Sequence, residues 1–325
     1  MWYNIREGNI MNTNFKIHFL NTIWSDSMLL ESEDHYAFVD CASKFYYPMI
    51  KDYLNKKNIK TIDFILLTHF HNDHYGNVAN IINNYDVKCL YMKKYCAKEG
   101  DTSNGHPVND DYIENELRMY DGILQSAKTN NVEIIYLDDD KYTEEDCYRI
   151  DFNGNILELY NLQNNINNVY DDESSPYYHK RMFSENNNSI IVYADINSHK
   201  IFLGSDLTES DTEAQTFYRV SEKILAHIYE KHHIDYIDVY KSCHHGGGGT
   251  NKAELINLLK AKYAVITNTD KWLERWETIP NLKNANPDVK IYQTDYYQYV
   301  FDFSKDDIDV EPIESTSLFI TLQKE

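Results

Sequence analysis

The sequence predicts a mixed α/β (α+β) domain built as a four-layer αββα sandwich. The chain has 325 residues, of which 42% are hydrophobic, so it can bury a large core. Short apolar runs with strand character recur in both halves of the chain, and segments with helical spacing lie between them. Two β-rich halves with flanking helices can share one core when their sheets pack face to face, which favours the sandwich.

In the first half, short apolar runs bounded by turn residues predict strands. Helical spacing, as for Met49, Ile50, Tyr53 and Leu54 on one face, predicts the helices. In the third of these helices we expect Leu117, Tyr120 and Leu124 to face inward. The expected strands are 15–19, 27–31, 36–40, 62–67, 87–92 and 132–137, and the expected helices are 47–57, 76–84 and 113–127.

The second half repeats this alternation, and its last three strands are expected to complete the second sheet. Two loop-like segments, 97–111 and 163–188, are rich in Asn, Asp, Ser and Tyr, and either border the site or are surface insertions. Residues 1–14 are interpreted as an extension and 15–325 as a single domain. The expected strands are 148–152, 156–162, 190–194, 201–203, 239–243, 263–267, 290–293 and 299–303, and the helices are 212–229 and 253–260.

Composition limits the partners and the location. The net charge is −21, with 31 basic against 52 acidic residues, which disfavours general nucleic-acid binding. No apolar run approaches the ~20 residues that a membrane helix needs, so no membrane association is expected. Five scattered cysteines and a start without a signal-type hydrophobic stretch favour a cytoplasmic location.

The most informative stretch is 65–77, where four metal-ligand residues directly follow the apolar run 62–67. Alternate residues leaving a strand point the same way, so His69 and His71 can approach one ion from one side. Asp73 and His74 follow where the chain turns, and can face a second ion. Neutral imidazole and carboxylate suit zinc and also accept manganese or iron.

This pattern, His-x-His-x-Asp-His, resembles the signature of the metallo-β-lactamase superfamily. Two later segments are similar to further motifs of that family. Residues 201–206 form an apolar strand ending in Gly-Ser-Asp, and 235–245 lead into His244 and His245, which four glycines follow. The resemblance spans roughly residues 15 to 300 and implies a metallo-β-lactamase-type sandwich with ligands along one edge of both sheets.

The resemblance implies a ligand set for two metal ions. His69, His71 and one of His244 and His245 would hold the first ion, with His245 preferred. Asp73 and His74 would hold the second, and Asp206 would bridge the two. With His245 as the ligand, His244 becomes a catalytic acid–base residue or an orienting neighbour, and Asp73 orients the attacking water.

Three further residues or segments have expected roles near the metals. Asp40 ends its strand and is a candidate partner for a ligand histidine. Lys241 is a weaker candidate than His244 for protonating the leaving group. The glycines 246–249 offer backbone N–H groups that could hold an oxyanion, or form only a tight turn.

The chain also departs from the family pattern. Many members carry another metal histidine before the strand that starts near Ser189, where this chain has Asn186-Asn187-Asn188. This departure resembles the branch that contains the metallo-hydrolase domain of DNA-uptake channel proteins and the phosphorylcholine esterases. The early Asp26-Ser27 step and the His-His-Gly step at 244–246 fit that branch too. With one ligand fewer than usual, the second metal site is expected to bind its ion weakly or exchangeably.

We therefore expect a hydrolase with two divalent metal ions, zinc first, with manganese or iron as alternatives. It would cleave a phosphodiester by a metal-bridging hydroxide, and its partner would be a small-molecule or phosphodiester substrate. A lactonase, thioesterase or other C–O or C–N hydrolase is the alternative, and a non-catalytic or redox member the third reading. Aromatic groups at 177–178, 272 and 276, and 296–299 could form a cage for a choline head group or simply pack. The oligomeric state stays open.

Overall fold

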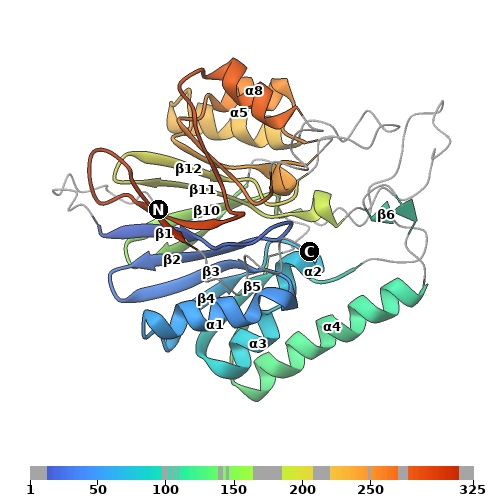
Figure 1. Cartoon of the computed structure of the whole chain (residues 1–325). Helices are drawn as coiled ribbons and strands as arrows, with labels where there is room; N and C mark the ends of the chain where they lie inside the picture. Colours follow the sequence, from blue (N-terminus) through green and yellow to red (C-terminus); the bar gives the residue numbers. More distant parts are fainter. Residues whose placement is uncertain are drawn as a thin grey trace, which may run out of the picture.

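The protein is a four-layer sandwich in which two large sheets pack face to face and helices cover both outer faces (Figure 1). This computed structural model describes residues 13–96, 102–103, 106–107, 110–137, 142–143, 146–163, 185–207, 220–247, 250–269 and 277–314. The mixed α/β architecture with two large sheets matches the metallo-β-lactamase fold. The expected domain boundary after residue 14 stays a prediction.

The first sheet has eight strands in the order β17-β16-β1-β2-β3-β4-β5-β8. β1, β2 and β3 form an antiparallel meander, whereas β3, β4, β5 and β8 run parallel to one another. The strands are β1 (Phe15–Phe19), β2 (Ser27–Ser32), β3 (His35–Cys41), β4 (Thr61–Leu66), β5 (Asp86–Met92), β8 (Glu133–Tyr136), β16 (Tyr297–Asp302) and β17 (Asp309–Glu314).

The second sheet has seven strands in the order β15-β14-β13-β12-β11-β10-β9, and β12 to β15 are parallel. A separate pair, β6 (Thr102–Ser103) and β7 (His106–Pro107), lies apart from both sheets. The strands of the second sheet are β9 (Tyr148–Phe152), β10 (Asn155–Tyr160), β11 (Ile191–Ile196), β12 (His199–Leu203), β13 (Val239–Lys241), β14 (Tyr263–Ile266) and β15 (Lys290–Gln293).

Helices seal the outer face of each sheet. α1 (Tyr47–Lys56), α3 (Val78–Asn84) and α4 (Asp110–Thr129) lie under the first sheet, and α5 (Val220–His232), α6 (Ala253–Leu259) and α8 (Thr278–Ala285) cover the second. The short α2 (Asn72–Tyr75) begins in the first metal motif. A central cluster of buried side chains from both sheets, including Phe15, Phe64 and Phe301, joins the two layers. Apolar side chains are thus buried between the two sheets and between each sheet and its helices.

Most expected elements are present within one or two residues, and two expectations are wrong. The strand expected at 299–303 is β16, which pairs with β1 in the first sheet and not with the second sheet. In α4, Leu117 is 43% exposed, and the buried positions of that helix are Glu116, Ile123 and Ala127. Tyr120 and Leu124 do pack against the core beneath the first sheet, so the expectation is wrong only at Leu117, and Glu116 is buried near Tyr75.

Parallel strands bring the sequence motifs together at one edge of the sandwich. β3 and β4 end near Asp40 and His69, while β12 and β13 end just before Asp206 and His244. Because the carboxyl ends of neighbouring parallel strands meet at the same sheet edge, four separate motifs converge there. No described helix is long and apolar enough to cross a membrane.

Candidate metal centre

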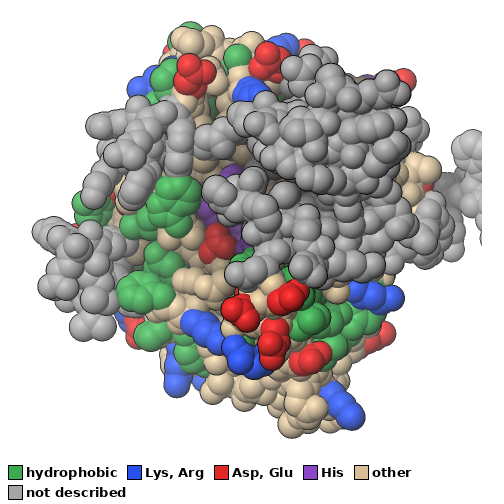
Figure 2. Space-filling model, turned by 90° about the vertical axis from the view of Figure 1, so that its right-hand side faces the viewer, with side chains coloured by type: hydrophobic (Ala, Val, Ile, Leu, Met, Phe, Trp, Pro, Cys, Tyr) green, Lys and Arg blue, Asp and Glu red, His purple; other side chains and the backbone are tan. Residues whose placement is uncertain are grey.

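The first motif forms the floor of the site. After β4 the chain leaves the sheet and turns into α2, where the backbone N–H groups of His74 and Tyr75 both donate to the His71 carbonyl at 2.9 Å. This turn holds His69, His71 and His74 close together, and all three rings are buried. Asp73 is the more open member, with a side chain that is 32% exposed. Figure 2 shows histidine and acidic side chains at the bottom of a hollow with hydrophobic side chains beside it.

One group of donors is already arranged as a metal site. His245 Nε2 lies 3.0 Å from Asp73 Oδ2 and 3.4 Å from Asp206 Oδ2. His74 Nε2 lies 3.2 Å from the same Asp206 oxygen and 3.8 Å from Asp73 Oδ2. Two atoms that bind one tetrahedral zinc at its usual bond lengths are about 3.3 Å apart. These four distances bracket that value, so Asp73, His74, Asp206 and His245 fit one ion.

A second group shares Asp206. His69 Nε2 lies 3.1 Å from His71 Nδ1 and 3.9 Å from Asp206 Oδ2. His244 Nε2 lies 3.8 Å from the same Asp206 oxygen. This carboxylate therefore stands between the two groups, as a bridging ligand would.

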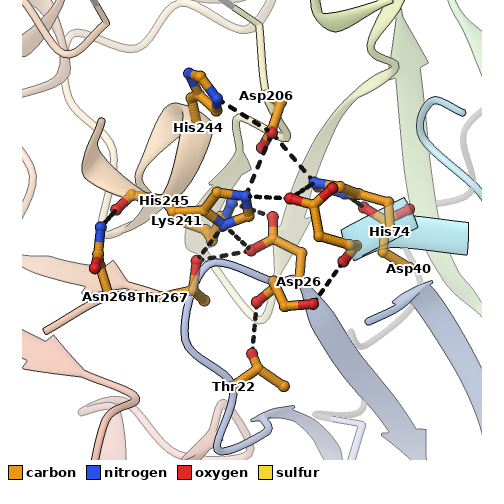
Figure 3. A network of polar contacts seen from close by, with 12 residues as sticks. Thr22, Asp26, Asp40, His74, Asp206, Lys241, His244, His245, Thr267 and Asn268 are labelled. Carbon is orange, nitrogen blue, oxygen red and sulfur yellow. Dashed lines mark hydrogen bonds and ion pairs between the residues drawn. The ribbon is translucent and has the colours of Figure 1, made fainter. Parts of the chain in front are cut away.

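This grouping differs from the expected one in one respect. The resemblance placed His245 with His69 and His71, but the structure places it with Asp73 and His74. The group with fewer donors is consequently the one that contains His69 and His71, and not the one that contains Asp73 and His74. The reason is local: the backbone turns sharply at 244–246, so His244 and His245 approach Asp206 from different directions (Figure 3).

Buried polar atoms test whether a metal suits this centre. Asp206 Oδ1 and His74 Nε2 are both buried without a hydrogen-bond partner. Such orphaned atoms are costly inside a protein, and a coordinated cation would satisfy them. The donor set of imidazoles and carboxylates also suits zinc, manganese or iron. The residues therefore fit divalent metal ions.

Two buried carboxylates orient two of the histidines. Asp40 Oδ2 accepts a hydrogen bond of 2.7 Å from His74 Nδ1, as the sequence led us to expect. Asp26 Oδ1 lies 3.1 Å from His245 Nδ1, and Thr267 Oγ1 lies 2.9 Å from the same nitrogen. In both rings the Nδ1 side is thereby occupied and the Nε2 side is left for a metal, which is the usual outer-shell arrangement around ligand histidines.

Lys241 does not have the role proposed for it from sequence. The side chain is fully buried, and its Nζ forms an ion pair with Asp26 Oδ2 (Figure 3). Burial lowers the pKa of Lys241, but attraction to Asp26 and Asp206 outweighs it and raises the pKa above its usual value. A buried ammonium bound to a carboxylate cannot deliver a proton to a leaving group in the hollow. Its charge instead balances Asp26 beneath the metal centre.

The pKa shifts separate the histidines into two kinds. Burial and the neighbouring His74 and His71 hold the pKa of His69 well below its usual value, so its ring is neutral. Burial also lowers the pKa of His74 and of His245, but nearby carboxylates led by Asp206 outweigh it and raise both well above the usual value. Where the carboxylates favour a proton they equally favour a metal cation.

Several residues around the candidate metal ligands have left-handed backbone angles. Trp24, Asp40, Ser205, His244 and His245 all have positive φ angles, of 52°, 57°, 47°, 47° and 54°. For residues other than glycine such angles cost roughly 1–3 kcal/mol each and persist only where the surroundings enforce them. Five of the sixteen described non-glycine residues with positive φ thus lie at this edge.

The glycines after His245 only partly match expectation. The Gly247 N–H donates to the His244 carbonyl at 2.6 Å, so it is not available to an oxyanion. Gly248 and Gly249 lie outside the described residues. The expected role for this segment is therefore wrong at Gly247, and what the described part provides is a tight turn.

The segment that replaces the family's extra histidine lies beside the first motif. Asn186, Asn187 and Asn188 form a short 3₁₀ helix, and Asn188 Oδ1 accepts a hydrogen bond of 3.1 Å from Lys93 Nζ. Just before it, Glu185 Oε1 accepts the Phe70 N–H at 2.8 Å. Part of the second loop-like segment thus borders the metal loop, while 97–101 and 164–184 fall outside the described residues.

The aromatic cage has no support among the residues that can be placed. Tyr299 packs on the core between the sheets, with its ring centroid 5.0 Å from that of Tyr292. The groups at 177–178, 272 and 276 lie outside the described part of the chain. An aromatic ring that does lie at the site is Trp24, half-buried, whose centroid is 6.1 Å from that of His245.

Sequence reasoning missed two contributors. Asp26 was noted as part of a motif but given no role, and Thr267 was not singled out. Their hydroxyl–carboxylate bond, 2.7 Å from Thr267 Oγ1 to Asp26 Oδ1, completes the support of His245. Both follow the rule that located Asp40, because each is a polar residue at or next to a strand end on the metal edge.

Comparisons with known proteins agree with this description. A family model described as the Metallo-beta-lactamase superfamily matches residues 25–135, which include the first metal motif. No curated protein matches the chain. Among solved structures, the metallo-β-lactamase fold protein YhfI from Bacillus subtilis is 10% identical, with 86% of this chain and 96% of that chain covered and a TM-score of 0.45.

Two further solved structures are similar to the chain. The short form of human tRNase Z is 13% identical, with 78% of this chain and 92% of that chain covered and a TM-score of 0.41. A diphosphatase from the PhnP family is 14% identical, with 76% and 71% covered and a TM-score of 0.37. Likeness at this level carries no argument about activity. The family model thus covers residues 25–135, and the two packed sheets with helices on both outer faces have the architecture of the metallo-β-lactamase fold.

Proposed function

We propose that the protein is a metal-dependent hydrolase with a dinuclear centre that cleaves a phosphodiester. One observation carries the proposal. A single oxygen of Asp206 lies 3.2, 3.4, 3.8 and 3.9 Å from the Nε2 atoms of His74, His245, His244 and His69. A carboxylate surrounded by four imidazoles from two other sequence motifs is suited to bridging two cations.

The residues would divide between two ions. His69, His71 and Asp206 face the first, whereas Asp73, His74, His245 and Asp206 face the second. Bound divalent ions would act as Lewis acids and lower the pKa of a coordinated water. Zinc is the ion that the imidazole-rich donor set favours.

The protein's own groups then position the reactants. The partly exposed Asp73 carboxylate can accept a hydrogen bond from the attacking water and orient it. Asp40 and the Asp26–Lys241 pair keep the rings of His74 and His245 in fixed orientations. The half-buried Trp24 ring packs edge-on beside His245.

Charge favours a phosphodiester among the ester substrates. Two divalent cations would face the ligand carboxylates of Asp73 and Asp206 and the Asp40 carboxylate behind His74, while Asp26 is balanced by Lys241. The centre would keep an excess of positive charge, which attracts a substrate that carries its own negative charge. The net charge of −21 for the whole chain argues for a small phosphodiester over a long nucleic acid. A cytoplasmic location stays a prediction from the cysteines.

The first experiment combines metal content with turnover. Protein purified without added metal is analysed by elemental mass spectrometry, and hydrolysis of bis(p-nitrophenyl) phosphate is followed with zinc and with manganese. We expect two metals per chain and diesterase activity. A lactone and a thioester are assayed in parallel. Turnover of either without diesterase activity would mean that the enzyme cleaves a C–O or C–S bond and not a phosphodiester.

The bridging assignment has its own test. Asp206→Ala should lose at least one metal and abolish hydrolysis, because the carboxylate serves both ions. Full activity with both metals retained would contradict the dinuclear arrangement around Asp206.

A further inference from the structure

We propose that His244 is a metal ligand, and that with His69, His71 and Asp206 it forms the first metal site. The inference rests on the dinuclear centre proposed above and adds a ligand to it. The sequence left open whether His244 or His245 is the ligand, preferred His245, and gave His244 the role of a proton donor or an orienting neighbour. The structure assigns it to coordination for the following reasons.

The first argument is the number of donors. Zinc in proteins is usually four-coordinate. Asp73, His74, His245 and Asp206 already supply four donors to the second ion. His69, His71 and Asp206 supply only three to the first.

The second argument is position. His244 Nε2 lies 3.8 Å from Asp206 Oδ2, nearly the same as the 3.9 Å from His69 Nε2 to that oxygen. Figure 3 shows His244 approaching Asp206 from a different side than His245 and His74. It therefore reaches the bridging carboxylate from a side that His245 and His74 leave open.

The third argument is how the backbone delivers the ring. His244 and His245 are consecutive residues with left-handed angles, φ 47° and ψ 50° followed by φ 54° and ψ 25°. Consecutive side chains in such a turn point in different directions, so the pair can reach two sides of one carboxylate. The His244 N–H donates to the Ser205 carbonyl at 2.8 Å, which ties this turn directly to the residue before Asp206.

The alternative donor nearby is not available in the described structure. Asn188, in the segment where a further histidine was missing, has its side-chain oxygen bound by Lys93 Nζ at 3.1 Å. An amide oxygen held by a lysine is a poor metal ligand, so Asn188 does not compete with His244.

The environment of His244 also sets the relative strength of the two sites. His74 and His245 each have a carboxylate on Nδ1, whereas His244 Nδ1 is buried without a hydrogen-bond partner. Outer partners of this kind typically change metal affinity by about 10–100-fold. The first site should therefore bind its ion more weakly, and the second site should fill first.

The test is a metal titration of the full-length apo-protein with Co²⁺ and with Zn²⁺, followed by calorimetry and by the visible spectrum of bound Co²⁺. The variant is His244→Asn, since Asn accepts left-handed backbone better than most residues. The matched control is His245→Asn, at the neighbouring left-handed position. We expect two binding events for the unchanged protein. His244→Asn should weaken the weaker event at least 10-fold and spare the tighter, and His245→Asn should weaken the tighter.

The other outcomes distinguish a failure of the His244 assignment from a failure of the dinuclear proposal. Two unchanged events in His244→Asn would remove His244 from the ligands but leave the dinuclear proposal standing. No metal binding by the unchanged protein would sink both proposals together. If His244→Asn does not fold, His244→Gly supplies the natural residue for this backbone, and added imidazole should restore the weaker event. An unchanged weaker event in His244→Gly, or a lost weaker event that imidazole does not restore, counts against the assignment.

Discussion

The Asp40 carboxylate lies 2.7 Å from His74 Nδ1, and both side chains are completely buried. Its other contacts are the N–H and the hydroxyl of Thr68, at 2.9 and 2.7 Å, in the strand end that precedes His69. Asp40 thereby connects the backbone just before His69 with the ring of His74. Its geometry fixes which nitrogen of His74 faces Asp206.

Replacing this carboxylate should weaken metal binding without removing a ligand. Asp40→Asn keeps an acceptor for Thr68 but loses the charge that favours His74 as a metal ligand, so affinity should fall by about 10–100-fold. Zinc affinity in competition with a chelator measures the effect. Asp63→Asn is the matched control, because Asp63 pairs with His35 Nδ1 at 2.6 Å on the surface. Equal affinities in the two variants would contradict the role of Asp40.

The fold and the local metal motif were largely predictable because their signals are short-range. The run 62–67 and the spacing of His69 to His74 place a strand and a ligand cluster without knowledge of any distant contact. Asp40 could be found by the same reasoning, since it ends a strand on the same edge. Element boundaries agreed within one or two residues wherever the apolar period was clear.

What could not be predicted depends on contacts between distant residues. His245 contacts Asp26, 219 positions away, and nothing in either segment specifies that pairing. The left-handed angles of His244 and His245 occur at residues other than glycine, so no local pattern indicated that the two rings would diverge. The strand at Tyr297–Asp302 joined β1 rather than β15, because strand pairing is decided by the whole sheet and not by the strand.

Removing Lys241 should destabilise the protein strongly. Lys241→Met would leave the Asp26 carboxylate buried without its counter-charge, and breaking a buried pair in this way typically costs ~3–5 kcal/mol. Urea unfolding in the presence of a chelator measures the loss independently of metal. Asp26→Asn combined with Lys241→Met removes both charges and should recover most of the stability. A double variant no more stable than Lys241→Met would mean that packing, and not charge, accounts for the loss.

At Gly204 the backbone after β12 comes close to the backbone after β13, and these two segments lead to Asp206 and His244. A Cβ atom at this position would lie 2.5 Å from Cys243 Sγ and 3.2 Å from the Lys241 carbonyl oxygen. Overpacking of this kind typically costs about 1–3 kcal/mol, so Gly204→Ala should lower thermal stability by such an amount. The same clash would shift Asp206 relative to His244 and weaken metal binding.

A second substitution separates steric strain from other causes. Cys243→Ala removes the sulfur atom that the new methyl group would meet, so Gly204→Ala with Cys243→Ala should be more stable than Gly204→Ala alone. Gly122 is the matched control, since a Cβ there would meet nothing within 4 Å. Additive losses in the double variant would show that the Cys243 contact is not the cause.

Acid stability should depend on Glu158, which lies away from the metal centre under α5. Its Oε2 accepts hydrogen bonds from Tyr160, Lys231 and His232 at 2.6, 3.0 and 2.9 Å, and Arg149 donates to Oε1. Burial raises the pKa of Glu158, but these donors outweigh it and lower the pKa to about 2 from the usual 4.5. The carboxylate is therefore bound more favourably in the folded than in the unfolded chain.

The direction of the pH effect follows from that shift. The stabilisation by Glu158 is fully present above pH 4.5 and is lost as the pH falls toward about 2, because the unfolded chain takes up the proton first. Glu158→Gln should lower stability at neutral pH and flatten its decline between these pH values, as measured by urea unfolding at a series of pH values. Glu254→Gln, at an exposed helix position, should leave the decline unchanged. Parallel pH curves for the unchanged protein and Glu158→Gln would show that the carboxylate does not carry this dependence.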